Sequence, residues 1–223
     1  GRRPALEGLD LAAAGIAHTA QGITVDARLR SSNRRVYAIG DVAGQGQFTH
    51  LAGYHAGIVV RAALFGLPAR ARHDHVPRAL YTTPELAQVG LTEAEARRAH
   101  GVALSVARFD LSGADRIIAE GQVTGDGPGH AGRVPATGLA KVMVVRGRPV
   151  GATMAGPQAA ELIGLWSLAI ARGLKMSDLS AMVVPYPTYA EVNKRVTSAY
   201  FMPHLFENQT VRRVVRLVQR WLP

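Results

Sequence analysis

The chain has 223 residues, 48% of them hydrophobic, and contains no cysteine, which excludes disulfides, thiolate metal sites and cysteine nucleophiles from it. Its formal net charge of +10 comes mostly from arginines scattered along the chain, and only 6% of its residues are aromatic, so a solvated basic surface is favoured over a nucleic-acid site. There is no charged-then-apolar leader and no apolar run of about 18 residues, which predicts a cytoplasmic protein without a membrane span.

The first candidate site follows a short predicted strand. Residues 22–29 alternate as one strand, and Val36–Ile39 form a second, apolar one that is stopped by Gly40. A glycine there lets a ligand approach the backbone, and the Asp41 carboxylate can accept hydrogen bonds from sugar or polyol hydroxyls. From spacing alone, an ordinary Gly-Asp turn is the alternative. The next segment, Gly44–Thr49, lacks the third glycine of a dinucleotide fingerprint and is predicted to be a loop.

A helix is predicted from Thr49 to Phe65, with Gly66 at its end. Small residues on this helix allow another surface to come close: Ala52, Gly53, Ala56 and Gly57. His50, His55 and Arg61 interrupt the segment and disfavour a membrane dimerisation face.

A polar, proline-bounded linker is predicted over residues 70–77. It contains His73-Asp74-His75, two histidines that could begin a metal site. Because no third and fourth ligand follows at a recognisable spacing, a solvated linker is the favoured interpretation.

The second domain is predicted to start near Arg78. Thr92 and Glu95 have the spacing of a capping box, and Gly101 is placed to end the helix that they begin. Alternating or apolar runs predict three strands, at residues 102–109, 139–145 and 149–154. The last two are predicted to form a hairpin. The glycine-rich segment 121–138 is predicted to be a flexible insertion rather than a phosphate site.

Two amphipathic helices follow. Gln158–Arg172 places its apolar residues on one side, which predicts a core or subunit-interface stripe. At the C-terminal end, Val211–Leu222 separates five apolar residues from four arginines. Docking of this helix onto the domain's own surface is the first prediction, and peripheral contact of residues 210–222 with an anionic membrane is the second.

Two stretches carry a family resemblance, VYAIGDVAG with HLAGYHAGIVVRAALF at residues 36–65 and TTPELAQVGLTE at residues 82–93. They resemble the second flavin-binding motif and the dimerisation domain of the FAD-dependent pyridine nucleotide-disulfide oxidoreductases, such as dihydrolipoamide dehydrogenase and mercuric reductase. The resemblance implies that Asp41, next to Gly40, holds the ribitol part of FAD, and that the helix carrying Ala52 packs beneath the flavin. The opening GRRP stretch resembles the segment after the family's NAD-binding domain, so the chain resembles the C-terminal part of a longer reductase.

Residues 184–200 resemble the segment that in many members reads His-Pro-Thr-x-x-Glu. There the histidine reaches the partner subunit's active site as an acid/base, and the glutamate orients it. Tyr186 stands at the histidine position and Glu191 at the glutamate position, and the resemblance implies that both are catalytic. Since a phenol with a pKa of about 10 is a poor base at neutral pH, Tyr186 is expected to donate a hydrogen bond, orient a substrate or serve as a hydroxyl ligand. A Thr188–Glu191 capping box is an alternative role for the glutamate.

A tyrosine in this region also occurs in the mercuric reductase branch, although the C-terminal cysteine pair of those enzymes is missing here. The predicted fold is α+β, a mixed or antiparallel sheet flanked by helices, preceded by a fragment of an α/β FAD-binding domain. The predicted segments are an FAD-domain fragment, a linker, a dimerisation domain and a basic amphipathic tail, at residues 1–69, 70–77, 78–203 and 204–223.

The expected function is that of a homodimeric flavoprotein, in which electrons pass from NAD(P)H through FAD to a disulfide, a metal ion or another small acceptor. The NAD(P)H site is expected to lie outside this chain, which alone should be inactive. The alternative is a standalone dimerisation or interaction module whose basic surface binds nucleic acid or anionic membrane.

Overall fold

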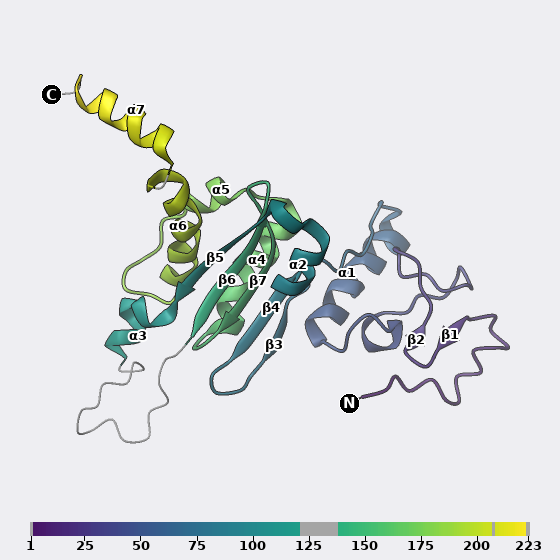
Figure 1. Cartoon of the computed structure of the whole chain (residues 1–223). Coiled ribbons are helices and arrows are strands. Elements are labelled where there is room, and N and C mark those ends of the chain that lie inside the picture. The colour runs from purple at the N-terminus through teal and green to yellow at the C-terminus, as the bar shows by residue number, and fades with distance from the viewer. Residues whose placement is uncertain (1, 121–137, 207, 222–223) are drawn as a thin grey trace, which may run out of the picture. The chain divides into compact units, whose positions relative to one another are not determined.

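The computed structural model describes residues 2–120, 138–206 and 208–221. The chain forms two compact units, Gly1–His73 and Asp74–Pro223 (Figure 1). Apart from Gly138, the predicted insertion at 121–138 lies outside the described residues. Within the described ranges, no helix is both long enough and apolar enough to cross a lipid bilayer.

The first unit is built around one long helix. A two-strand antiparallel ribbon, a short 3-10 helix and the long helix follow each other along the chain as β1 (His18–Thr19), β2 (Gly22–Ile23), η1 (Gly40–Ala43) and α1 (Thr49–Phe65). The predicted helix is confirmed with both of its bounds, and Gly66 ends it in the left-handed region at φ 63°.

The two strands predicted in this unit are much shorter in the structure, so the predicted bounds are wrong. Only Gly22–Ile23 of residues 22–29 is a strand. Val36–Ile39 is extended at Ile39, with φ −133° and ψ 157°, but among the described residues its only ladder contact is a single bridge between Arg30 and Tyr37. A β-favouring run becomes a strand only where a neighbouring strand accepts its hydrogen bonds, and that condition cannot be read from the run itself.

The second unit contains a five-stranded sheet in the order β3-β4-β7-β6-β5, and every neighbouring pair is antiparallel. The strands are β3 (Arg78–Leu80), β4 (Leu86–Gly90), β5 (Leu104–Asp110), β6 (Leu139–Val145) and β7 (Arg148–Ala155). The predicted hairpin between β6 and β7 is confirmed, with Arg146 and Gly147 both at positive φ in its turn. The sheet confirms the predicted α+β class.

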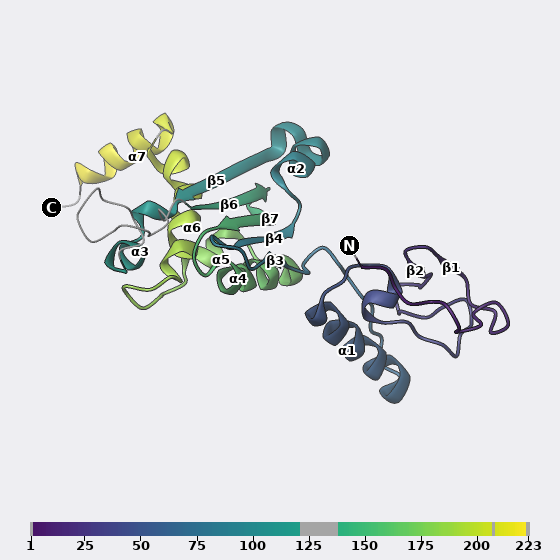
Figure 2. The same cartoon turned by 90° about the horizontal axis from the view of Figure 1, so that it is seen from below.

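One face of the sheet is covered by the helices α4 (Ala159–Arg172) and α6 (Glu191–Phe206), as Figure 2 shows. Alternate residues of the strands, such as Val89, Val142 and Met154, form one buried core with Trp166 of α4 and Val196 of α6. Glu85, in the stretch TTPELAQVGLTE, accepts a hydrogen bond from the backbone N–H of Ala160, 3.0 Å away. This carboxylate therefore satisfies a donor at the start of α4.

The helix α2 (Glu93–His100) starts with the predicted capping box. The Thr92 hydroxyl accepts from the Glu95 N–H at 3.3 Å, and the Glu95 carboxylate accepts from the Thr92 N–H at 2.8 Å. Gly101 ends this helix, as predicted. The remaining short helices of the unit are η2 (Gly101–Ala103), η3 (Leu111–Gly113), α3 (Asp115–Ala119) and α5 (Met176–Ser180).

The last helix, α7 (Gln209–Gln219), carries the basic amphipathic pattern of the tail. None of its residues is buried, and Val214, Leu217 and Val218 are each about half exposed. The prediction that this helix docks onto the domain's own surface is therefore wrong. Helix periodicity shows which residues share a face, but it does not show whether the rest of the domain offers a surface to that face.

Candidate functional site

The Gly40-Asp41 turn is held by close packing against α1. Gly40 has φ 63°, and a Cβ atom added to it would lie 2.9 Å from the Cβ of Ala52. Glycine is therefore required at this turn both for its backbone conformation and for its contact with the helix. Gly40, Asp41 and Ala52, which the family resemblance predicts to lie at a flavin site, lie in one part of the first unit.

A buried histidine lies beneath this turn. The backbone N–H of Gly40 donates to Nδ1 of His55, 3.1 Å away, and His55 is 0% exposed. Since Nδ1 accepts, the ring proton sits on Nε2, which lies 3.0 Å from Nε2 of His73 and donates to it. Burial, and next the repulsion from His73 when that ring is protonated, lower the pKa of His55 below its ordinary value of 6.5.

Sequence reasoning missed both histidines. The polar character of His55 suggests an interruption of the apolar helix, but His55 shares a buried stripe with Leu51 and Ile58 at positions i−4 and i+3. The polar sequence around His73 predicts a solvated linker. In the structure, residues 71–73 are bonded to the first unit, where Ala71 N–H donates to Ala27 O at 2.7 Å.

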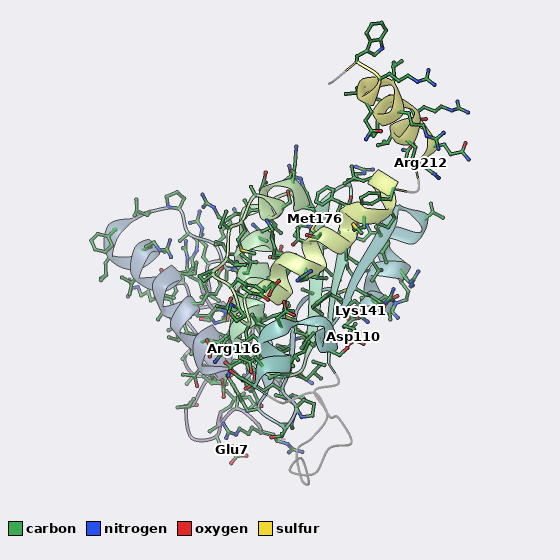
Figure 3. All side chains as sticks on the ribbon, turned by 90° about the vertical axis from the view of Figure 1, so that its left-hand side faces the viewer. Glu7, Asp110, Arg116, Lys141, Met176 and Arg212 are labelled. Carbon is green, nitrogen blue, oxygen red and sulfur yellow. The ribbon has the colours of Figure 1, made fainter. Side chains whose placement is uncertain are left out.

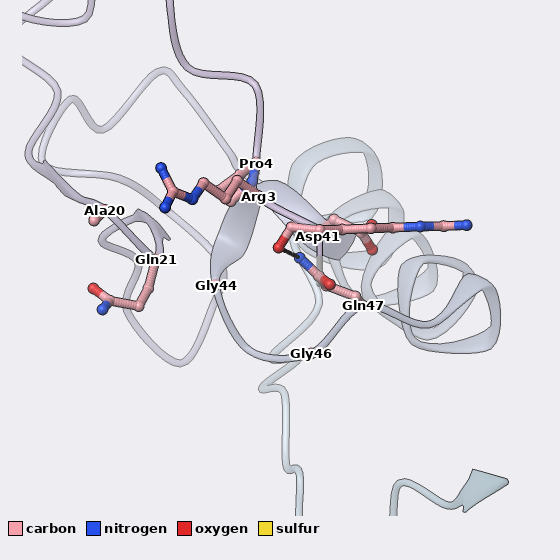
Figure 4. A pocket seen from close by; sticks show the side chains of 9 residues that line it. Arg3, Pro4, Ala20, Gln21, Asp41, Gly44, Gly46 and Gln47 are labelled. Atoms are coloured by element: carbon pink, nitrogen blue, oxygen red, sulfur yellow. Dashed lines mark hydrogen bonds between the residues drawn. The ribbon is translucent and has the colours of Figure 1, made fainter. Parts of the chain in front are cut away.

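A cavity of about 280 Å³ opens beside the turn (Figure 4). Its lining is made of polar side chains, glycines and two small residues: Arg2, Arg3, Pro4, Ala20, Gln21, Asp41, Gly44, Gly46 and Gln47. The Gln47 amide closes one side by donating to the carbonyl of Arg2 at 2.9 Å. Carboxylate and amide oxygens suit polyol hydroxyls, and guanidinium groups suit phosphates, so the lining fits part of a sugar-phosphate ligand such as a dinucleotide.

Tyr186, in the second unit, bonds to a carboxylate that sequence reasoning did not find. Its hydroxyl donates to Oδ2 of Asp115, in α3, at 2.8 Å, and its side chain is largely exposed. The hydrogen bond to Asp115, together with the negative charge of that group, raises the pKa of the Tyr186 phenol above 10. The two residues are 71 positions apart, and no pattern in the sequence links them.

Glu191 makes neither of the contacts expected of it. Its Oε1 accepts from the Arg195 guanidinium at 2.8 and 2.9 Å, whereas its buried Oε2 has no hydrogen-bond partner among the described residues. The Thr188 hydroxyl donates to the carbonyl of Pro185 instead of accepting from the Glu191 N–H, so the predicted capping box is wrong. Glu191 is 8% exposed, and its bonded partner is one turn further along α6.

Arg195 connects these groups, since its guanidinium also lies 3.9 Å from Oδ2 of Asp115. Tyr186, Asp115, Arg195 and Glu191 thus form one polar cluster, referred to below as the tyrosine cluster. No group of three or more histidine, aspartate or glutamate side chains in the described residues is arranged to hold a metal ion.

Two family models match the chain. The model for the pyridine nucleotide-disulphide oxidoreductase dimerisation domain matches residues 76–197, and that for pyridine nucleotide-disulphide oxidoreductases matches residues 1–56. The first match spans the sheet, α4 and the start of α6. The second contains the Gly40-Asp41 turn and the start of α1.

Curated proteins and solved structures are similar over nearly the whole chain. Dihydrolipoyl dehydrogenase of Thermus scotoductus is 38% identical over 86% of this chain and 39% of its own length. Mercuric reductase of Bacillus cereus is 33% identical over 86% of this chain and 28% of its own length.

Among solved structures, the HOCl-induced flavoprotein disulfide reductase RclA from Escherichia coli matches with a TM-score of 0.73 and 27% identity, over 89% of this chain and 43% of its own. The chain therefore spans less than half of the length of these proteins. With a dimerisation-domain model matching more than half of its residues, the chain belongs to the pyridine nucleotide-disulphide oxidoreductase family.

Proposed function

We propose that this chain forms one wall of an FAD site and the dimerisation domain of a homodimeric NAD(P)H-dependent reductase. The observation that carries the proposal is the exposed Asp41 carboxylate, at the edge of a 280 Å³ cavity and on a turn that only glycine allows. FAD, when bound, supplies two-electron transfer between a nicotinamide and an acceptor. The cavity lies at the low end of ligand-pocket volumes, about 300 Å³ and upward, so it would hold part of the cofactor.

In the FAD site, Asp41 would accept hydrogen bonds from the ribitol hydroxyls. Gly40 lets the backbone approach the ligand and packs against Ala52, which supports the turn from beneath. The arginines of the cavity, Arg2 and Arg3, would offset phosphate charge. This division of roles rests on the family membership and on the chemistry of the lining residues.

The tyrosine cluster is proposed to face the electron acceptor. Because the bond to Asp115 raises the pKa of the phenol, Tyr186 stays protonated at neutral pH and cannot act as a general base there. Its exposed hydroxyl can reorient from Asp115 to a substrate and either donate a hydrogen bond or bind a metal ion. The buried Oε2 of Glu191, which has no hydrogen-bond partner among the residues that the structure describes, would accept a proton or a hydrogen bond from the acceptor.

The acceptor class is proposed to be a disulfide or a metal ion. The similar proteins include a dihydrolipoyl dehydrogenase and a mercuric reductase, and RclA was also solved as a Cu(II) complex. A tyrosine at position 186 instead of a histidine favours an acceptor that needs a ligand or a hydrogen-bond donor over one that needs a base at neutral pH.

The dimer is supported by an apolar row on the sheet face opposite α4 and α6. Leu80, Leu86 and Leu139 lie in one register row across β3, β4 and β6, through Ala155 of β7, and all three leucines are exposed. Exposed leucines in a contiguous row are typical of a protein contact surface. We propose that a second copy of the chain covers this row.

The test uses the chain within a polypeptide that also carries the nicotinamide domain. Asp41→Ala is expected to lower the FAD content of the purified protein at least tenfold, whereas Glu7→Ala, a matched change at an exposed acidic residue of the same unit, leaves it unchanged. Tyr186→Phe is expected to retain FAD and to lower turnover with disulfide or metal acceptors. Full FAD content in Asp41→Ala would remove this residue from the flavin site.

A further inference from the structure

The helix α7 is amphipathic to an unusual degree. Wound at about 100° per residue, its apolar side chains fall within an arc of about 160° and its arginines within the opposite arc of about 100°. The apolar arc contains Val211, Val214, Val215, Leu217 and Val218 and is continued by Trp221 in the turn after the helix; the basic arc contains Arg212, Arg213 and Arg216 and is continued by Arg220 at the C-cap. Figure 3 shows the side chains of this helix, with Arg212 labelled.

The apolar arc has no cover within the described part of the chain. Val211 is partly exposed, the exposure of the other five residues ranges from 45% for Val215 and Val218 to 82% for Trp221, and no residue of the helix is buried. The neighbouring end of α6 adds Met202, Leu205 and Phe206, each more than half exposed. Apolar surface left in water along a whole helix costs free energy, and it is typical of a surface that binds a partner.

The charge pattern restricts what the partner is. Four arginines fall in the 14 residues from Asn208 to Trp221, and none of these residues is acidic. A basic face without acidic residues matches a partner of uniform negative charge, whereas helices that pair in solution usually mix both signs on their exposed positions. The partner must therefore offer an apolar layer and an anionic layer at the same place, over the length of the helix.

A bilayer that contains anionic lipid has this layered structure. At 1.5 Å per residue the 11-residue helix is roughly 16 Å long, about half of the ~30 Å hydrocarbon core, so it is too short to span and would lie in the interface. Its apolar arc would then enter the acyl boundary while the arginines stay at the headgroups. We propose that α7 is an interfacial helix that binds the surface of anionic membranes, independently of the reductase function.

Nucleic acid fits less well, because it would neutralise the arginines but leave the apolar arc in water. Pairing with α7 of a second copy would cover the apolar arc but leave the four arginines of each helix without a counter-charge. Both alternatives are distinguished from membrane binding in the experiment below.

The chain contains its own probe of the insertion. It has two tryptophans, of which Trp166 is fully buried and donates to Oδ1 of Asn193 at 2.8 Å, whereas Trp221 is 82% exposed in the apolar arc. Since Trp166 is already shielded from water, a blue shift of the emission on adding vesicles reports Trp221. With the full chain, we expect a blue shift and co-sedimentation with vesicles of phosphatidylcholine and 30% phosphatidylglycerol, and at least tenfold weaker binding to pure phosphatidylcholine vesicles.

Three variants separate the contributions. Arg213→Glu/Arg216→Glu should weaken binding about 25-fold or more, since each basic residue near an anionic surface contributes about fivefold. Val214→Ser/Val218→Ser should reduce the blue shift by removing apolar contacts. Arg34→Glu/Arg35→Glu, the same change in charge at exposed arginines of the first unit, should bind like the original chain.

Four results would overturn the proposal. The first is an unshifted emission with anionic vesicles, and the second is equal binding of Arg213→Glu/Arg216→Glu and the original chain. The third is a lower mass in solution for Val214→Ser/Val218→Ser than for the original chain, which would show that two copies pair through α7. The fourth is tighter binding to duplex DNA than to anionic vesicles at the same salt concentration.

Discussion

The backbone N–H of Gly40 donates to Nδ1 of His55 at 3.1 Å, and this bond joins the proposed flavin turn to the interior of α1. Because Nδ1 must accept, the bond also decides the tautomer of His55 and directs its Nε2 proton toward His73. The turn that carries Asp41, the residue after Gly40, is therefore bonded to a neutral imidazole 15 residues beyond Gly40. We infer that His55 is a positioning residue of the turn.

Replacing His55 with leucine should loosen the turn. Leucine fills the buried position in α1 but cannot accept a hydrogen bond. The buried Gly40 N–H is then left without its acceptor, which costs about 1–3 kcal/mol. The amide of Gly40 should then exchange with solvent about 5- to 150-fold faster, as measured by NMR hydrogen exchange. His18→Leu, at an exposed histidine of the same unit, is the control and should not change this rate. Unaltered exchange in His55→Leu would show that the bond does not hold the turn.

The same bond predicts a pH dependence. Burial lowers the pKa of His55 below 6.5, so its neutral form is favoured in the folded state. The stability that this contributes is fully present above pH 6.5, and it is lost as the pH falls toward the lowered folded pKa. Exchange of the Gly40 amide, corrected for its intrinsic pH dependence, should therefore accelerate below pH 6.5. His55→Leu should lack this acceleration, and its persistence there would assign it to another group.

Asp115 should control the ionisation of Tyr186. The hydrogen bond to the carboxylate and its negative charge both raise the pKa of the phenol, so Asp115→Asn should shift that pKa back toward 10. The shift is measurable by NMR of the chain labelled at the ring carbon that bears the tyrosine hydroxyl, and Tyr186→Phe assigns the signal. Glu161→Gln, at an exposed position of α4, is the matched control. An unchanged titration in Asp115→Asn would mean that the bond is not maintained in solution.

Glu93 should make the second unit sensitive to acid. Its carboxylate pairs with Arg97 at 2.6 Å, Arg108 at 2.8 Å and Lys141 at 3.0 Å, and the hydrogen bonds from these groups lower its pKa to about 2. A carboxylate with a lowered pKa contributes stability that is present above pH 4.5 and lost as the pH falls toward 2.

Glu93→Gln should lower the free energy of unfolding at pH 7 by about 1 kcal/mol, a small value because the arginines are half exposed and screened. It should also reduce the difference in stability between pH 7 and pH 3. Urea unfolding followed by the fluorescence of buried Trp166 measures both. Equal pH dependence in Glu93→Gln and the original chain would contradict the assignment to this network.

The sequence by itself determined the elements whose bonds are local. The bounds of α1, the capping box of α2 and the hairpin of β6 and β7 all depend on hydrogen bonds and turn residues a few positions apart, and each was predicted from the residues that make it. The family motifs around Asp41 and Glu85 were equally readable, because they are contiguous. The amphipathic pattern of α7 is also local.

Only the tertiary structure decided which distant groups meet. It paired His55 with Gly40 and His73, and Tyr186 with Asp115, across 15, 18 and 71 positions. Within the described residues, it also left Val36–Ile39 without a strand partner and left every apolar residue of α7 at least partly exposed. The physical reason is common to these cases: a side chain's hydrogen-bond and packing partners come from any part of the chain, and periodicity or spacing records only the residue's own neighbours.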